Sequence, residues 1–189
     1  VLMLQANYRS VEPVIRAAES ILADVAFKQD KATAAIRSAP PGSHGVKLVT
    51  PFDPARDLSA LHREIAAQCE YARSIDSRER TAVLLLGRRN DTLKDIQAGL
   101  DRKLPVKAYT IHRAKGLQAE VAIIVDDCLP TTAHPLRNAL YAHCGFFANS
   151  YDQAMADESL RLGYVAVTRG VSRVLWFVRK PQGATRVLS

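Results

Sequence analysis

The chain has 189 residues, of which 48% are hydrophobic, and its formal net charge is +7. This length and apolar content suffice for one domain with a buried core, and no apolar run approaches the roughly 18 residues that a transmembrane helix needs. Three widely spaced cysteines argue against a disulfide framework and favour a reducing, cytoplasmic location. The positive charge favours a polyanionic partner, but charge alone does not separate DNA from RNA or from an acidic protein.

Short apolar runs along the chain predict buried strands at 1–4, 46–50, 82–86, 106–111, 121–125 and 174–178. Between them, apolar residues repeat at intervals of three or four and predict helices over about 11–22, 58–69 and 93–100. Strands that alternate with amphipathic helices are typical of an open, mostly parallel α/β sheet with helices on both faces. Pro- and Gly-rich residues 39–45 predict a loop, and the irregular stretch 130–151 is functional, disordered or contains a short helix.

Three polar segments lie beside predicted strands. The first is QANYRS (5–10), which follows the strand at 1–4 and should therefore place Tyr8 and Arg9 at a strand's carboxyl end, the edge where open α/β sheets bind ligands. The second is TIHRAKGLQ (110–118), between two strands, and the third is ESLRLGYVAVTR (158–169), a helix that ends beside the last strand.

Each segment also has an ordinary explanation. An Asn-Tyr-Arg-Ser loop alone is more often a solvated turn, and His112 alone would be a hydrogen-bonded surface histidine. Arg169 alone would be a cation that stabilises a helix C-terminus. The occurrence of all three segments, in this order on an α/β background, favours a functional site.

Together the three segments resemble motifs IV, V and VI of UvrD/Rep-type superfamily 1 DNA helicases. A weaker match is VLLLGRRN (83–90), and the run GLQA (116–119) is most similar to the helicase IV branch. The resemblance covers residues 5–177. It implies that residues 1–189 form a single second RecA-like domain of a larger ATP-dependent helicase, whose first RecA-like domain lies outside this sequence.

The resemblance assigns four residues to a shared nucleotide site. Tyr8 would stack on the adenine, and Gln118 would hydrogen-bond the ribose in place of the glutamate that many relatives have. Arg9 and Arg169 would be the catalytic residues, two arginine fingers on the γ-phosphate. The cofactors implied are ATP and Mg²⁺, with Mg²⁺ held mainly by the first RecA-like domain.

Three further residues match positions that contact single-stranded DNA in the family, namely Asn90, Thr110 and His112. Small polar groups at strand ends can bind phosphate oxygens without reading bases, as a translocating motor requires. The expected partners are therefore single-stranded or duplex DNA and the first RecA-like domain, with no membrane.

Some motifs are missing. The sequence has no Gly-x-x-x-x-Gly-Lys-Ser/Thr loop, so the isolated chain is expected to be inactive as an ATPase. Many relatives insert a helical subdomain near 100–110, where this chain has only a short connection. The alternative is a non-enzymatic nucleic-acid-binding or regulatory module with a degenerate helicase fold. A small-molecule α/β enzyme is disfavoured, because no glycine-rich dinucleotide loop is present.

The sequence predicts no metal site in this chain. Asp126 and Asp127 follow a strand as metal-binding aspartates do in nucleotide hydrolases, but without a phosphate loop they are read as a strand terminus. Cys128, His134, His143 and Cys144 fit none of the usual zinc spacings.

Overall fold

The computed structural model describes residues 6–23, 25, 34–130, 132–145 and 150–189. The predicted strand at 1–4 and Gln5 lie outside these residues. The elements in chain order are β1 (Ala6–Asn7), α1 (Glu12–Ile21), β2 (Ala34–Ala35), β3 (Val46–Val49), α2 (Pro54–Ser74), β4 (Val83–Gly87), α3 (Asn90–Ala98), β5 (Val106–Thr110), the 3₁₀ turn η1 (Ile111–Ala114), β6 (Ala119–Val125), α4 (Pro135–His143), α5 (Tyr151–Val167), β7 (Gly170–Phe177) and α6 (Gly183–Val187).

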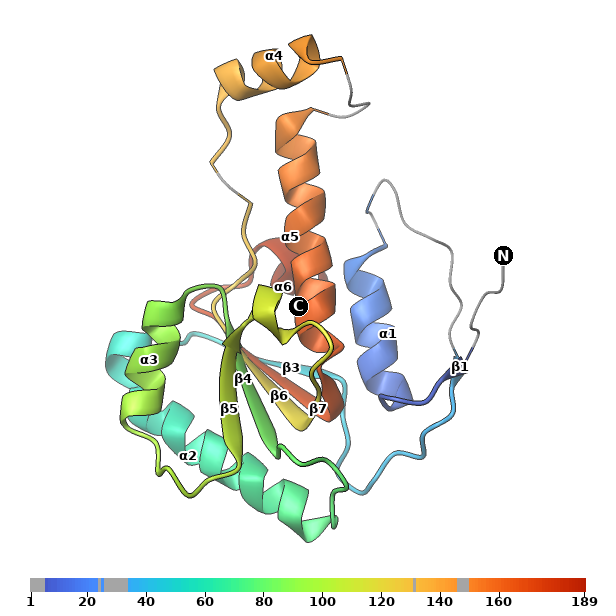
Figure 1. The fold of residues 1–189 in the computed structure, drawn as a ribbon, viewed down its shortest axis with the longest axis vertical. Helices are drawn as coiled ribbons and strands as arrows, with labels where there is room; N and C mark the ends of the chain where they lie inside the picture. The colour runs from blue at the N-terminus through green and yellow to red at the C-terminus, as the bar shows by residue number, and fades with distance from the viewer. Residues whose placement is uncertain (1–5, 24, 26–33, 131, 146–149) are drawn as a thin grey trace.

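Five strands form the central sheet in the order β3-β7-β6-β4-β5, and every neighbouring pair is parallel (Figure 1). The fully buried strands β4 and β6 lie inside the sheet, as continuous apolar runs require. The two short strands β1 and β2 pair separately and also run parallel. The predicted open parallel α/β architecture is confirmed.

Helices cover both faces of the sheet, because successive side chains of each strand point to opposite sides. Along β6, Ala122 and Ile124 pack in a core with α1, α5 and α6, whereas Ile123 and Val125 pack in a second core with α2 and α3. In Figure 1 α2 and α3 lie on one side of the strands, and α1 and α5 on the other. The predicted two-sided packing is also confirmed.

Two strands begin earlier than the apolar pattern predicts. Strand β6 starts at Ala119 and includes Glu120, which is fully buried, and β7 starts at Gly170. The polar residues at these strand ends have partners: Ser172 Oγ donates to the Glu120 carbonyl (3.2 Å), and the Arg173 guanidinium stacks on the Tyr71 ring at 3.2 Å. Apolar periodicity does not detect a strand end whose polar side chains make tertiary contacts.

The long irregular stretch 130–151 contains the short helix α4, which Figure 1 places beyond the N-terminal end of α5 and away from the sheet. Asn138 and Asp152 connect the two helices through two hydrogen bonds of 2.7 and 3.1 Å. A short helix is one of the alternatives that the sequence leaves open for this stretch. The apolar pattern gives no signal for α6, which has only five residues.

Gly163 in α5 allows α1, α6 and the sheet strand β7 to pack closely against this helix. A Cβ atom at this position would lie 2.6 Å from the Ala184 Cβ, 3.2 Å from the Trp176 ring and 3.6 Å from Ile21. All three neighbours are buried and have little room to move. A glycine here therefore lets α5 lie close to these neighbours. Arg169 follows the C-terminal end of this helix.

We expect Gly163→Val to lower the free energy of unfolding by about 1–3 kcal/mol, because extra methyl groups overpack the core between α5, α6 and β7. Ala139→Val on the exposed surface of α4 is the matched control and should cost less than about 1 kcal/mol. Chemical denaturation of both variants measures the difference. Equal effects would show that the space around Gly163 is not restricted.

Candidate functional site

Residues 7–10 form a tight turn held by their own asparagine. Asn7 Oδ1 accepts hydrogen bonds from the backbone N–H groups of Arg9 (2.8 Å) and Ser10 (3.2 Å). The buried Ser10 Oγ donates to the Gly170 carbonyl at 2.8 Å, and the Val11 N–H donates to the Val171 carbonyl at 2.9 Å. The turn thus holds Tyr8 and Arg9, which lie between Asn7 and Ser10, beside the start of β7.

Tyr8 and Arg9 point outward from this turn. Tyr8 is 72% exposed, which is unusual for an aromatic ring, and Arg9 is also exposed. The sequence predicts that they lie at a strand's carboxyl end, and they do directly follow β1, but the expectation that this is the carboxyl edge of the main sheet is wrong. They follow β1, which is outside the five-stranded sheet, and lie beside the amino end of β7. The cause is the long-range tether from Ser10 to Gly170, which periodicity does not reveal.

Arg169 is buried, with only 8% of its surface exposed, at the point where α5 meets β7. Its Nε donates to the Val165 carbonyl (3.0 Å), and its Nη1 donates to the carbonyls of Leu117 (3.1 Å) and Ala114 (3.5 Å). Its Nη2 donates to Thr168 Oγ1 at 3.1 Å. Four of the five guanidinium N–H groups therefore donate hydrogen bonds. These bonds hold the end of α5 against residues 114–117.

All of these acceptors are neutral. Within the described part of the chain, none of the ion pairs involves Arg169 or Arg9. Burial, followed by the positive charge of the neighbouring Arg9, lowers the pKa of the Arg169 guanidinium. A buried cation that also senses a second positive charge is stabilised by a nearby anion.

Gln118 directly follows the segment that Arg169 holds. Its Nε2 donates to both carboxylate oxygens of Glu79, at 3.1 and 3.0 Å. Arg37 Nη1 donates to Glu79 Oε1 (3.3 Å) and to the Arg9 carbonyl (3.4 Å), so this polar chain reaches the turn that carries Arg9. Sequence reasoning missed Glu79 and Arg37, because neither lies in a recognisable motif.

The structure thus brings Tyr8, Arg9, Gln118 and Arg169 to one edge of the sheet. Ala119 of β6 pairs with Gly170 of β7 at this edge, which is formed by the amino ends of the two strands.

The three residues predicted to bind DNA lie at the other edge. Thr110 ends β5 and is level with the ends of β4 and β6, Asn90 begins α3 after β4, and His112 lies exposed in η1. Strand β6 has seven residues, so the predicted nucleotide-binding residues and the predicted DNA-binding residues are about 20 Å apart along the sheet. Residues 111–118 connect one edge directly to the other.

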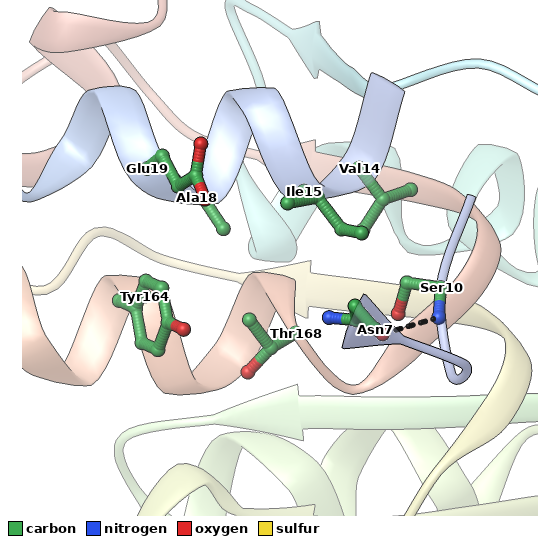
Figure 2. A pocket seen from close by; sticks show the side chains of 8 residues that line it. All are labelled: Asn7, Ser10, Val14, Ile15, Ala18, Glu19, Tyr164 and Thr168. Carbon is green, nitrogen blue, oxygen red and sulfur yellow. Dashed lines mark hydrogen bonds between the residues drawn. The ribbon is translucent and has the colours of Figure 1, made fainter. Parts of the chain in front are cut away.

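A small pocket lies between α1 and α5, beside the turn that contains Asn7 (Figure 2). Its lining includes Asn7, Ser10, Ile15, Glu19, Tyr164 and Thr168. The volume of about 20 Å³ suffices for about one water molecule and is far too small for a nucleotide. This pocket is therefore not a nucleotide site.

Asp127 has a structural partner. Its Oδ2 accepts hydrogen bonds from the Gln182 N–H (3.0 Å) and from Thr185 Oγ1, which together hold the start of α6. Burial raises the pKa of Asp127, and it also raises that of Asp126. Among the described residues there is no group of three or more His, Cys, Asp or Glu side chains that could hold a metal ion.

Comparison with solved structures finds a similar fold in the C-terminal domain of a possible DNA helicase from Lactobacillus plantarum WCFS1. The two chains are 15% identical with a TM-score of 0.56, over 97% of this chain and 94% of the other. This similarity establishes the fold, and the predicted RecA-like α/β class is confirmed. No protein family and no curated protein matches the sequence. In the described part of the chain, each helix is too short or too polar to span a membrane.

We expect Asp127→Ala to lower the free energy of unfolding by about 1–3 kcal/mol, because the Gln182 N–H and the Thr185 hydroxyl lose their acceptor. Asp101→Ala is the control, since Asp101 is exposed and accepts a bond from the nearby Lys103 N–H. Denaturation should be followed with and without added Mg²⁺. Stability that is unchanged by the substitution, together with a lost response to Mg²⁺, would favour a metal ligand instead.

Proposed function

We propose that this chain is the second RecA-like domain of a superfamily 1 ATP-dependent DNA helicase of the UvrD/Rep type, closest to the helicase IV branch. In this proposal ATP and Mg²⁺ bind mainly to the first RecA-like domain of the same protein. The present domain adds Arg9, Arg169, Tyr8 and Gln118 to a shared site. The isolated chain should then show no ATPase activity above background, with or without single-stranded DNA.

The observation that carries this proposal is the buried guanidinium of Arg169, which lies close enough to Arg9 for that second positive charge to lower its pKa. A buried arginine usually has a carboxylate partner, and the acceptors of Arg169 are all neutral. A phosphate group would supply the missing negative charge and accept charge-assisted hydrogen bonds. Arg9, being exposed, can contact it directly, while Arg169 contributes its charge and its remaining N–H.

Other features at the same edge support a nucleotide. Tyr8 is a largely exposed ring next to Arg9, and stacking on a purine would cover that ring. The surface is open rather than enclosed, as expected when a second domain completes the site. The similarity in fold to the C-terminal domain of a possible DNA helicase agrees with this arrangement.

The opposite edge suits a nucleic-acid backbone. Asn90, Thr110 and His112 offer polar groups, and the first N–H groups of α3, which have no side-chain cap, lie beside Asn90 where a phosphate could accept from them. Contacts of this kind bind DNA with little base preference. The segment 111–118 runs from this edge to the buried Arg169, so movement at one ligand can reach the other.

In the full-length protein, we expect Arg9→Ala to reduce DNA-stimulated ATP turnover by about a thousandfold or more, as for other arginine fingers. Affinity for single-stranded DNA should remain nearly unchanged. Arg169→Ala should act in the same direction, and Arg169→Lys separates charge from the hydrogen bonds that Arg169 makes within the domain. Arg63→Ala on the exposed side of α2 is the control.

Steady-state ATPase assays and fluorescence anisotropy with a labelled oligonucleotide measure the two parameters separately. The assignment fails if Arg9→Ala retains normal turnover, or if Arg169→Ala weakens DNA binding and spares hydrolysis.

The double variant Asn90→Ala/His112→Ala should have the opposite effect. We expect it to weaken single-stranded DNA affinity by about 1–3 kcal/mol in total, through the loss of two phosphate hydrogen bonds. More DNA would be needed for half-maximal ATPase stimulation, but the maximum rate should persist. A fall in maximum rate at saturating DNA, with unchanged affinity, would remove these residues from the DNA path.

A further inference from the structure

A polar cluster lies beneath the proposed nucleotide edge, next to the turn that carries Arg9. It consists of Arg37, Ser77, Glu79, Gln118 and Glu120, which come from three separate parts of the chain. Glu79 is anchored at its backbone as well, because its N–H donates to Ser77 Oγ at 3.2 Å. The cluster thus connects the loop before β4 to the start of β6.

Glu120 is the buried end of this cluster. Its Oε2 accepts a hydrogen bond from Ser77 Oγ (2.5 Å) and lies 3.8 Å from Arg37 Nη2, whereas Oε1 has no hydrogen-bond partner among the described residues. A fully buried carboxylate is costly to desolvate. It attracts the Arg37 guanidinium, which also reaches Glu79 and the Arg9 carbonyl. Arg37 is thereby held between the two acids.

Glu79 determines which end of the Gln118 amide faces outward. An ionised carboxylate only accepts hydrogen bonds, so the NH₂ group of Gln118 must point toward Glu79 and its Oε1 must point elsewhere. Because both carboxylate oxygens contact the same Nε2, rotation of the amide would break both contacts. The side chain is therefore fixed as a hydrogen-bond acceptor.

We propose that Glu79 is a positioning residue that acts through Gln118. By fixing the amide, it presents Gln118 Oε1 as an acceptor for a sugar hydroxyl of the bound nucleotide. This inference rests on the proposed function, since it needs a nucleotide at this edge. Arg37 keeps Glu79 in place and ties it to the turn of Arg9, so the sugar-binding and phosphate-binding groups share one support.

The test is a double-mutant cycle in the full-length protein with Glu79→Ala, Gln118→Ala and the combined variant. We expect each single variant to raise the KM for ATP by about threefold to tenfold, the effect of one hydrogen bond, and to leave kcat within about twofold. The combined variant should match Gln118→Ala alone, because Glu79 acts only through that side chain. Glu79→Gln keeps one acceptor oxygen, so its KM should fall between those of wild type and Glu79→Ala.

Inhibition by inorganic tripolyphosphate gives a second readout, because this probe has neither sugar nor base. Its inhibition constant should be unchanged in Glu79→Ala and should rise in Arg9→Ala. Glu70→Ala, on the exposed surface of α2, is the control for loss of an acidic side chain. Thermal unfolding of each variant, including the milder Glu79→Gln, identifies any general loss of folding.

The inference is overturned by additive KM effects in the cycle, by a KM unchanged in either single variant, or by a main effect on kcat. Failure of the proposed function would give a different result from failure of this inference. In that case Arg9→Ala would retain turnover, whatever happens at Glu79.

Discussion

The buried guanidinium of Arg169 is the interaction on which the candidate site depends. It joins the last turn of α5 to the carbonyls of Ala114 and Leu117, so two stretches of chain meet at the amino ends of β6 and β7. The turn that carries Arg9 is bonded to Gly170, the residue that immediately follows Arg169. The geometry of this edge is therefore built around a charge whose acceptors among the described residues are all neutral.

The sheet separates the two proposed ligands and also connects them. Tyr8 and Arg9 lie at one edge, and Asn90 and His112 lie about 20 Å away at the other. Parallel strands with helices on both faces enclose two buried cores, and residues 111–118 connect one edge of the sheet to the other. In the proposed motor, a change at the phosphates would be transmitted through this segment and the hydrogen bonds of Arg169.

The edge also contains polar groups in places where apolar ones would pack more simply. Glu120 occupies a fully buried position in β6, and Ser77 and Arg37 supply its partners only in part. Such an arrangement contributes little to stability, since desolvation of the charge offsets its attraction to the cation. Its value lies in orientation, because it fixes Glu79 and through it the amide of Gln118. Apolar residues of similar volume would give a core at least as stable as this cluster does.

The sequence by itself determined the sheet and its two covered faces, because runs such as those at β4 and β6 have the continuous apolar character that only buried parallel strands require. The resemblance of its motifs to those of a helicase family also implied that Arg9, Gln118 and Arg169 belong together. Tertiary structure alone decided which edge they occupy, since the bond from Ser10 to Gly170 joins residues 160 positions apart. It alone revealed Glu79 as well, because the partner of a side chain is set by how strands and loops pack rather than by local spacing.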